Sequence, residues 1–352
     1  MKKKLGIGII GLGVISDIHI EALQRIEEAR VAAVCTRDPH KAAETAGILG
    51  CSWYTDYRKL ADDPGVEAVI LCTPSGSRLP MVEYIAAAGK HIISEKPLEV
   101  TPERIDRMLE VCRQNNVYIA SIFHKRYHPV YKWIKESIDS GMFGDLVTTD
   151  VLMKWYRPPE YYSESKWRGT MELDGGGALM NQCVHFIDMA QWFNGGMKTV
   201  YARTAKKLHK GIEAEDTAVA AVEYNSGAFG VIEATTSAYP GFSTIITVNG
   251  TRGGVICENE EIREARVMGI TSEKLDYPGK GNYGEHGGDA RNNVKKDISL
   301  HLSQLSEIVK SLIGGKQPPV SGEEARKAVE IITSMYKSAS EGRAVEIGRL
   351  QR

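Results

Sequence analysis

Short apolar runs alternate with amphipathic stretches along the first third of the chain. The apolar runs occupy residues 4–10, 30–36, 66–74, 91–94 and 117–123. Stretches with hydrophobic residues at helical spacing lie between them, at residues 17–29, 38–50, 78–90 and 101–116. Strands that are apolar throughout are typical of a parallel sheet covered by helices on both faces. The pattern therefore predicts a doubly wound α/β domain over residues 1–123.

The alternation stops after Phe123, and a more varied pattern follows. It predicts a helix, a strand with two-residue alternation, a glycine-led helix and two closing helices, at residues 128–141, 145–156, 175–195, 301–316 and 321–342. Between them, from Val200 onward, Asn-Gly and Asn-Ser-Gly turns predict antiparallel hairpins in a sheet whose flat face would suit self-association. The glycine-rich stretch around His286 is predicted to be a mobile loop. We assign residues 124–352 to a second α/β domain.

The composition is that of a globular protein with two domains. The chain has 352 residues, 42% hydrophobic and 25% charged, and its 44 Lys and Arg nearly balance 45 Asp and Glu. This balance gives no support for nucleic acid or a membrane as partner. The first lysines resemble the start of a signal peptide, but the glycines that follow, Asp17 and His19 argue against one. The six cysteines contain no CxxC pair, so we expect buried thiols, no metal and a cytoplasmic location.

A glycine-rich turn follows the first predicted strand and opens the first predicted helix. Its sequence is Gly11-Leu12-Gly13-Val14-Ile15-Ser16. Glycines permit a tight turn and let a pyrophosphate approach the amides at the helix N-terminus, and Ser16 is small enough for close helix–strand packing. A tight turn without a ligand is the alternative. The position between a strand and a helix favours dinucleotide binding.

The end of the second predicted strand bears on the choice between NAD and NADP. An acidic side chain there would accept from the ribose 2′-OH of NAD, whereas arginine accommodates the 2′-phosphate of NADP. In our register Thr36 occupies this position, Arg37 follows it, and Asp38 caps the next helix. The pattern slightly favours NADP, although a shift of one residue would make Asp38 a reader of NAD.

Lys96 stands where the chain leaves an apolar strand. It lies in the stretch Ser94-Glu95-Lys96-Pro97, directly after the strand predicted at residues 91–94. Parallel sheets bind ligands at the carboxyl ends of their strands, and a proline holds the residue before it in extended geometry. A solvated loop lysine is the alternative. We interpret Lys96 as a cation that is held in place for chemistry.

Aromatic and basic residues gather in one loop of the second domain. They are Tyr156, Arg157, Tyr161, Tyr162, Trp167 and Arg168. Aromatic rings stack on sugars and nucleobases, and arginine pairs with carboxylate or phosphate. The loop could instead pack on itself or at a subunit interface. We take Tyr156, Trp167 and Arg168 as candidate substrate-binding residues.

The glycine-led helix is predicted to carry polar residues on one face. Asn181, His185 and Asp188 have the spacing i, i+4 and i+7. A surface stripe with a hydrogen-bonded histidine is the structural explanation. The functional interpretation makes His185 a group that titrates near neutral pH and is oriented by Asp188 or Asn181.

Together these motifs resemble the Gfo/Idh/MocA superfamily, named after glucose–fructose oxidoreductase, inositol dehydrogenase and rhizopine catabolism. The matching stretches are the glycine turn with His19, the segment Cys72-Thr73-Pro74-Ser75-Gly76-Ser77-Arg78, Glu95-Lys96-Pro97, and residues 175–188. The likeness covers nearly the whole chain. Residues 155–185 look most like members that act on sugars and sugar nucleotides.

The resemblance implies a nicotinamide-dependent oxidoreductase with a Rossmann domain and a C-terminal α/β domain built on a large, mostly antiparallel sheet. It places Thr73, Pro74, Glu95 and Lys96 at the cofactor. The peptide bond before Pro97 is expected to be cis.

The resemblance also implies roles for Lys96 and His185, which are expected to flank the carbon that exchanges hydride. His185 would take the hydroxyl proton, and Lys96 would stabilise the developing negative charge. Asn181 stands where the family often has Asp. Because Asn cannot take a proton, we expect it to bind and orient the substrate hydroxyl.

The expected substrate is a carbinol or ketone of a sugar, cyclitol or sugar nucleotide, with NAD or NADP as cofactor. We expect a homodimer or homotetramer. A dihydrodiol- or xylose-type NADP dehydrogenase is the alternative within the enzyme class. A non-catalytic NAD(P)-binding sensor is the other alternative, and the presence of Lys96 and His185 favours the enzyme.

Overall fold

The computed structural model describes residues 4–280 and 298–348. It divides into two compact units, Met1–His124 with Val294–Arg326, and Lys125–Asn293 with Lys327–Arg352. Residues 298–326, which the sequence pattern assigned to the second domain, belong to the first unit. The loop residue His286 lies outside the described part of the chain.

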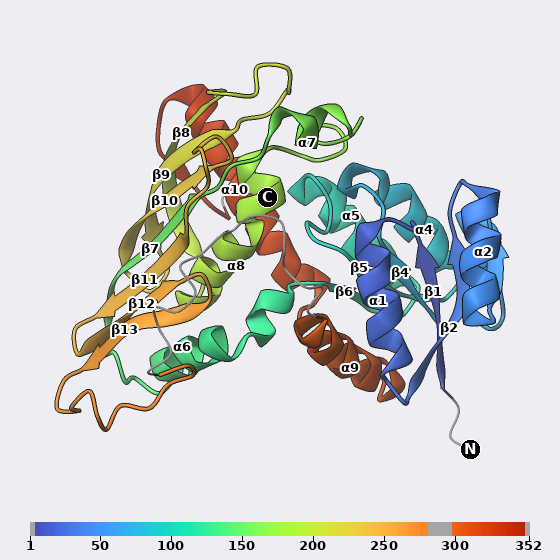
Figure 1. Cartoon of the computed structure of the whole chain (residues 1–352), viewed down its shortest axis with the longest axis horizontal. Helices are drawn as coiled ribbons and strands as arrows, with labels where there is room; N and C mark the ends of the chain where they lie inside the picture. Colours follow the sequence, from blue (N-terminus) through green and yellow to red (C-terminus); the bar gives the residue numbers. More distant parts are fainter. Residues whose placement is uncertain (1–3, 281–297, 349–352) are drawn as a thin grey trace. The chain divides into compact units, whose positions relative to one another are not determined.

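A six-stranded parallel sheet is the centre of the first unit, as the apolar runs predict (Figure 1). Its order is β3-β2-β1-β4-β5-β6. The strands are β1 (Leu5–Ile10), β2 (Ala29–Cys35), β3 (Ser52–Tyr54), β4 (Ala68–Leu71), β5 (His91–Ser94) and β6 (Ile119–Ser121). The helices between them are α1 (Val14–Gln24), α2 (Pro39–Leu49), α3 (Tyr57–Ala61), α4 (Leu79–Ala87) and α5 (Pro102–Gln114). The strand order reverses between β1 and β4.

Local side chains set the limits of these helices. Asp38 accepts hydrogen bonds from the backbone of His40 and Lys41 and so caps α2, which ends at Gly50 in the left-handed region. Thr101 caps α5 in the same way. β3 and α3 were not predicted from the sequence, because elements of 3 and 5 residues are too short to show a hydrophobic period.

Helix α9 (Ser299–Ile313) belongs to the first unit although it lies near the end of the chain. Its apolar side chains recur at helical spacing and are buried in one cluster with residues of α1 and the sheet. They are Leu305, Ile308, Val309 and Leu312. Burying an aliphatic side chain contributes roughly 1.5–3 kcal/mol, so this face explains why the segment packs with the first unit.

An eight-stranded mixed sheet dominates the second unit (Figure 1). Its order is β13-β12-β11-β7-β10-β9-β8-β14, in which β7 and β10 pair in parallel and the other neighbours are antiparallel. The strands are β7 (Leu146–Lys154), β8 (Met197–Ala205), β9 (Thr217–Tyr224), β10 (Phe229–Thr235), β11 (Thr244–Gly250), β12 (Gly253–Glu258), β13 (Glu261–Val267) and β14 (Val345–Glu346).

Helices cover one face of this sheet. Apart from α9, the helical elements described after β6 are η2 (His124–Tyr127), α6 (Pro129–Asp139), α7 (Pro159–Ser163), the π-helix η3 (Ala178–Cys183), α8 (Val184–Phe193) and α10 (Gly322–Glu341). Of these, α8 and η3 contact β7 and β10. On the other face several apolar side chains are exposed, Phe229 by 63%.

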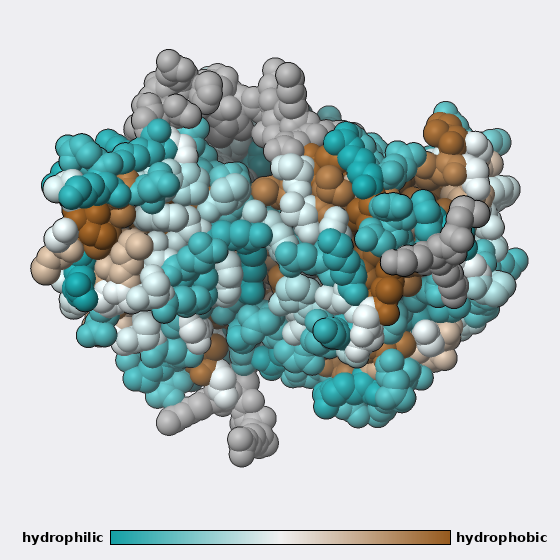
Figure 2. Space-filling model, turned by 90° about the horizontal axis from the view of Figure 1, so that it is seen from below, coloured by the Kyte–Doolittle hydropathy of each residue, from teal (hydrophilic) through white to brown (hydrophobic). Residues whose placement is uncertain are grey.

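The surface is hydrophilic over most of the face seen in Figure 2, with hydrophobic residues in separate patches. Within residues 4–280 and 298–348, no helix combines the length and the apolar character needed to cross a membrane. The cysteines of this part of the chain are free thiols.

Candidate active site

Residues expected to bind the cofactor lie at the carboxyl ends of four strands of the first unit. The glycine turn follows β1, Thr36 and Arg37 follow β2, Thr73 and Pro74 follow β4, and Glu95, Lys96 and Pro97 follow β5. These strands are neighbours, and β1 and β4 flank the point where the strand order reverses. Doubly wound sheets bind ligands at this edge.

The glycine turn leaves room for a phosphate group. Gly11 has φ +92°, and a Cβ there would lie 3.0 Å from the backbone of Cys72. A Cβ on Gly13 would meet nothing within 4 Å, and Val14 is 77% exposed. No side chain caps the N-terminus of α1, which fits a dinucleotide pyrophosphate as the acceptor for its first amides.

The end of β2 has the register assumed from the sequence. Thr36 directly follows the strand, and its backbone N–H donates to Tyr54 O at 3.3 Å. The Asp38 carboxylate is engaged in capping α2. The exposed Arg37 lies between them.

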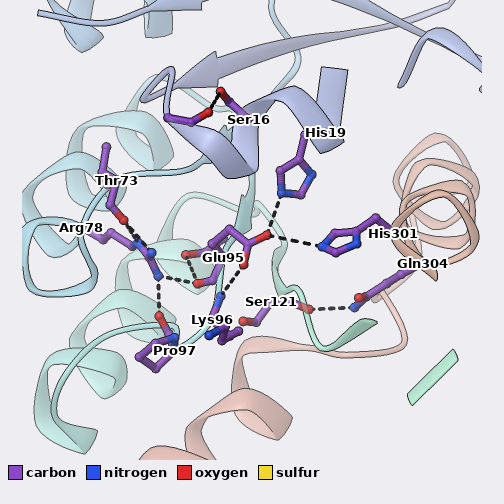
Figure 3. A network of polar contacts seen from close by, with 12 residues as sticks. Ser16, His19, Thr73, Arg78, Glu95, Lys96, Pro97, Ser121, His301 and Gln304 are labelled. Carbon is purple, nitrogen blue, oxygen red and sulfur yellow. Dashed lines mark hydrogen bonds and ion pairs between the residues drawn. The ribbon is translucent and has the colours of Figure 1, made fainter. Parts of the chain in front are cut away.

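Glu95 is the centre of a buried polar network (Figure 3). Its Oε1 lies 2.8 Å from His19 Nε2 and 3.9 Å from His301 Nε2, and its Oε2 accepts from Lys96 N at 3.2 Å. Burial raises the pKa of Glu95, but the hydrogen bond and charge of His19 and the charges of His301 and Lys96 outweigh it and lower the pKa to about 2. Glu95 is therefore a buried anion beside Lys96. The Lys96–Pro97 peptide is cis.

The glycine-led helix of the second unit is not one regular α-helix. It begins as the π-helix η3, which holds Asn181, and becomes the α-helix α8 one residue before His185. His185 is 7% exposed and Asp188 is fully buried, so the surface-stripe interpretation is wrong. Short π-helical segments are frequent at functional sites.

Asp188, one of the two residues expected to orient His185, is bound to other side chains instead. Its Oδ2 accepts from Arg126 Nε at 2.7 Å, and its Oδ1 accepts from Arg126 Nη2 at 2.6 Å and from Gln191 at 3.1 Å. The bidentate ion pair fixes α8 to η2. Asp188 is thus an anchor for the helix.

Asn181 is oriented by Asp174. Its Nδ2 donates to Asp174 Oδ1 at 2.6 Å, and Asp174 Oδ2 accepts from the backbone of Gly169 at 2.8 Å. A carboxylate only accepts hydrogen bonds, so the amide nitrogen must face Asp174. The Asn181 carbonyl oxygen therefore points the other way.

The aromatic and basic loop packs partly on itself. Tyr161 has the guanidinium of Arg168 4.2 Å and that of Arg157 5.2 Å from its ring centroid, and Arg168 Nη1 donates to Tyr161 O at 3.0 Å. The hydroxyl of Tyr161 accepts from Gln182, the residue after Asn181, at 3.0 Å. The loop is thus connected to η3 through Tyr161.

The three candidate substrate residues of the loop fall into two groups. Arg168 contacts Trp167 as well as Tyr161, with 5.7 Å between its guanidinium and the Trp167 ring. Tyr156 instead forms an edge-to-face contact with Tyr239, at 5.2 Å between ring centroids.

Glu215 holds the start of η3. Its carboxylate accepts from Leu179 N at 2.8 Å and from Gly177 N at 3.2 Å, and its backbone carbonyl accepts from Ala178 N at 3.1 Å. A Cβ on Gly177 would collide with the Glu215 backbone at 1.7 Å, which explains the glycine. Burial raises the pKa of Glu215 to about 7, although these amides oppose the shift.

The free energy of unfolding is expected to fall as pH rises from about 4.5 to about 7. Because the raised pKa of Glu215 means that the folded state binds the proton more tightly than the unfolded state, deprotonation destabilises the fold, by roughly 3 kcal/mol across this window. Urea unfolding at pH 5 and pH 8 measures this difference. It should shrink by that amount in Glu215→Gln and persist in Glu44→Gln, which alters an exposed side chain; an equal pH dependence in both variants would contradict the assignment.

No motif or spacing in the sequence indicated that Arg126, Asp174, Glu215 or His301 would belong to the site. Each acts through a partner far away in the chain or by capping backbone groups. His19 and Arg78 occurred in stretches used for the family resemblance, but their partners were not predictable.

Two family models match the chain. The model described as "Oxidoreductase family, NAD-binding Rossmann fold" matches residues 5–123, and the one described as "Oxidoreductase family, C-terminal alpha/beta domain" matches residues 135–347. Both are models of the GFO_IDH_MocA group.

Individual proteins match over most of their length. The myo-inositol 2-dehydrogenase of Thermotoga maritima is 29% identical over 348 residues, which are 97% of this chain and 98% of that protein. The uncharacterized oxidoreductase YrbE of Bacillus subtilis is 30% identical over 79% of this chain and 81% of its own. The WlbA dehydrogenase of Bordetella pertussis, solved in complex with NADH and UDP-GlcNAcA, has a TM-score of 0.89 at 28% identity and 99% coverage of both chains.

Proposed function

Because the chain belongs to the Gfo/Idh/MocA oxidoreductase family, we propose that Lys96, His185 and Asn181 act together on one carbon of a carbohydrate substrate. The protein is an NAD(P)-dependent oxidoreductase that acts on CH–OH groups of sugars, cyclitols or sugar nucleotides. One observation supports the site most directly. The backbone N–H of Lys96 is bound by the buried Glu95–His19 pair, at the same edge of the sheet as the glycine turn.

The first unit holds the cofactor in this proposal. The amides of Val14 and Ile15 at the start of α1 bind the pyrophosphate, and Thr36 and Arg37 contact the adenosine ribose. Thr73, Pro74, Ser16 and Glu95 complete the cofactor site. When bound, the nicotinamide supplies or accepts the hydride. The hydroxyl and guanidinium after β2 slightly favour NADP, whereas the family model described as NAD-binding and the NADH complex of the WlbA dehydrogenase favour NAD.

Lys96 and His185 are the acid–base residues of this proposal. His185 takes the proton of the substrate hydroxyl, and the Lys96 ammonium stabilises the negative charge that develops on the same oxygen. The carbonyl oxygen of Asn181 accepts a hydrogen bond from the substrate. Trp167, Arg168 and Tyr156 contact the remainder of the substrate. That the two units serve one substrate rests on the family resemblance.

Asn181→Asp is expected to lower kcat/KM about tenfold instead of adding a base. It would place a second carboxylate within hydrogen-bonding distance of Asp174, and one of the two would then bind a proton. The exchange Asn181→Asp with Asp174→Asn restores one donor and one acceptor and should recover most of the loss. Higher activity in the single variant than in the wild type would contradict this orientation of Asn181.

One experiment tests the function. NADH and NADPH are titrated by fluorescence, and the more tightly bound cofactor is used with cyclitols, aldoses and UDP-sugars. Turnover with any of these classes supports the proposal. Turnover confined to xylose or dihydrodiols with NADP would favour the alternative dehydrogenase. Stoichiometric cofactor binding without turnover in a broad screen would favour the non-catalytic sensor.

Sugar nucleotides come first among these substrates. The structural relative solved with UDP-GlcNAcA aligns over almost the entire chain. The aromatic and basic loop offers rings and guanidinium groups of the type that bind a nucleobase and a diphosphate.

Self-association through the uncovered face of the eight-stranded sheet is part of the proposal, with a second copy as the partner. Tyr201 on β8 and Val231 on β10 both pair with Ala221 on β9, so they form one apolar row. Val219 and Phe229 extend it, and apart from Ala221 these side chains are 41% to 63% exposed. Contiguous apolar patches of this type mark interfaces.

Phe229→Asp is expected to convert the homodimer or homotetramer to a smaller species. It places a charge at the end of the apolar row, where burial in an interface would be costly. Sedimentation velocity measures the change, and Ile48→Asp, at an exposed apolar site on α2, serves as control. An unchanged sedimentation coefficient in Phe229→Asp would exclude this face.

We further propose a cytoplasmic protein with no nucleic-acid or membrane partner. The support is the free thiols of the described residues and the balanced charge of the chain.

A further inference from the structure

Arg78 joins the loops that follow two neighbouring strands. It directly precedes α4, and its side chain is buried, with 3% exposure. Its Nε and Nη2 donate to Thr73 O at 3.1 and 2.6 Å, and its Nη1 donates to Glu95 O and Pro97 O. Thr73 follows β4, and Glu95 and Pro97 follow β5. Figure 3 shows the guanidinium between these groups.

The carbonyl groups that Arg78 binds lie on both sides of Lys96. Glu95 O belongs to the peptide before Lys96, and Pro97 O to the residue after it. The N–H of Lys96 itself donates to the Glu95 carboxylate, which is held by His19. The backbone around Lys96 is therefore bound at its donor and at the acceptors on either side.

A guanidinium suits this task better than any other side chain. It presents five N–H donors in a rigid plane, whereas a lysine ammonium presents three from a single point. Burial lowers the pKa of Arg78 to about 10, and the charges of Glu95, Cys72 and Glu99 oppose the shift. The group therefore remains a cation at neutral pH, and its charge strengthens the hydrogen bonds to the carbonyls.

A purely structural role would not require this arrangement. Burying an ion is costly, and well-packed apolar residues often stabilise a fold equally well. Here the buried Arg78 guanidinium donates hydrogen bonds to a carbonyl of the turn after β4 and to the carbonyls that flank Lys96. Both turns carry residues that we assign to cofactor binding or to catalysis.

We propose that Arg78 is a positioning residue for Lys96. It touches neither substrate nor cofactor; it locks the loop after β5 to the loop after β4 so that the Lys96 amine is aimed. This inference rests on the role of Lys96 in the proposed function. It adds that a residue on another loop sets the lysine's geometry.

The test compares two variants with the wild type. Arg78→Lys keeps the charge and loses the planar fork, and Arg78→Met keeps the length and loses the charge. Because small displacements of a reacting group lower rates steeply, kcat is expected to fall about tenfold to a hundredfold in both. The Kd for NADH should change less than kcat. Arg107→Lys, which alters an exposed ion pair with Glu83, is the matched control and should leave kcat unchanged.

A second readout does not depend on turnover. Competitive acylation followed by mass spectrometry gives the reactivity of the Lys96 amine as a function of pH in the full chain. The Arg78 variants should shift the Lys96 profile and leave that of Lys90, at the other end of β5, unchanged. A shift confined to Lys96 is not expected from general destabilisation.

The outcomes separate this inference from the proposed function. Unchanged kcat and an unchanged Lys96 profile in Arg78→Lys would overturn it. Failure of both variants to fold, judged by circular dichroism, would make Arg78 a folding residue and would also overturn it. If the wild type has no turnover on any carbohydrate, the proposed function fails, while the acylation profile still reports whether Arg78 positions the lysine.

Discussion

Lys96→Met is expected to lower kcat by about a hundredfold to a thousandfold while the Kd for NADH changes only a few-fold. Methionine keeps the length and apolar part of the side chain and removes the cation that stabilises the developing alkoxide. Loss of a single such group in a preorganised site has effects of this size. The glycine turn and the residues after β2 remain in place, so most cofactor contacts survive. Steady-state kinetics and NADH fluorescence measure the two quantities.

Lys90→Met is the matched control for this variant. Lys90 precedes β5, as Lys96 follows it, and its amine donates to Val66 O at 2.7 Å. Its replacement should leave kcat near the wild-type value. The assignment of Lys96 would be wrong if Lys96→Met lost NADH binding and yet turned over normally at saturating cofactor.

His185→Ala is expected to lower kcat by about a hundredfold to ten-thousandfold, the usual contribution of a general acid or base. The variant should also lose one ionisation from the pH dependence of kcat/KM, because the group that accepts the hydroxyl proton is gone. The profile is measured from pH 5 to 10 with the best substrate of the screen.

His40→Asn, which alters an exposed residue of α2, should keep both the rate and the profile. If the pH profile of His185→Ala matched that of the wild type, His185 would have no acid–base role. Partial activity with an intact profile would point to Lys96 as the proton acceptor.

Local patterns were enough to predict the framework of the first unit. The apolar runs, the cap at Asp38 and the glycine turn each depend on interactions within a few residues of the chain. The strands and helices that they specify can therefore be predicted without knowing what packs against them. The position of Lys96 follows from the same logic, because a residue after a parallel strand must lie at the edge where ligands bind.

Periodicity failed where the helix itself was irregular. The spacing of Asn181, His185 and Asp188 assumes a regular α-helix, but η3 is a π-helix whose first turn is held by Glu215 from a distant loop. Such a bulge depends on a partner about 36 residues away in the chain, and no short-range pattern reports it.

The amino-acid sequence alone was sufficient for the fold class, whereas the cofactor-binding edge and the acid–base candidates that it indicates stay predictions. The tertiary structure decided which partners bind these residues. Arg78 and Glu95 bind the backbone around Lys96, and Asp174 binds the side chain of Asn181. Asp188 pairs with Arg126 and not with His185. The tertiary structure also brought α9 back to the first unit. The physical reason is that strands and caps arise from short-range forces, whereas a buried charge takes the nearest compatible partner in space, and that partner is chosen by the packing of the whole unit.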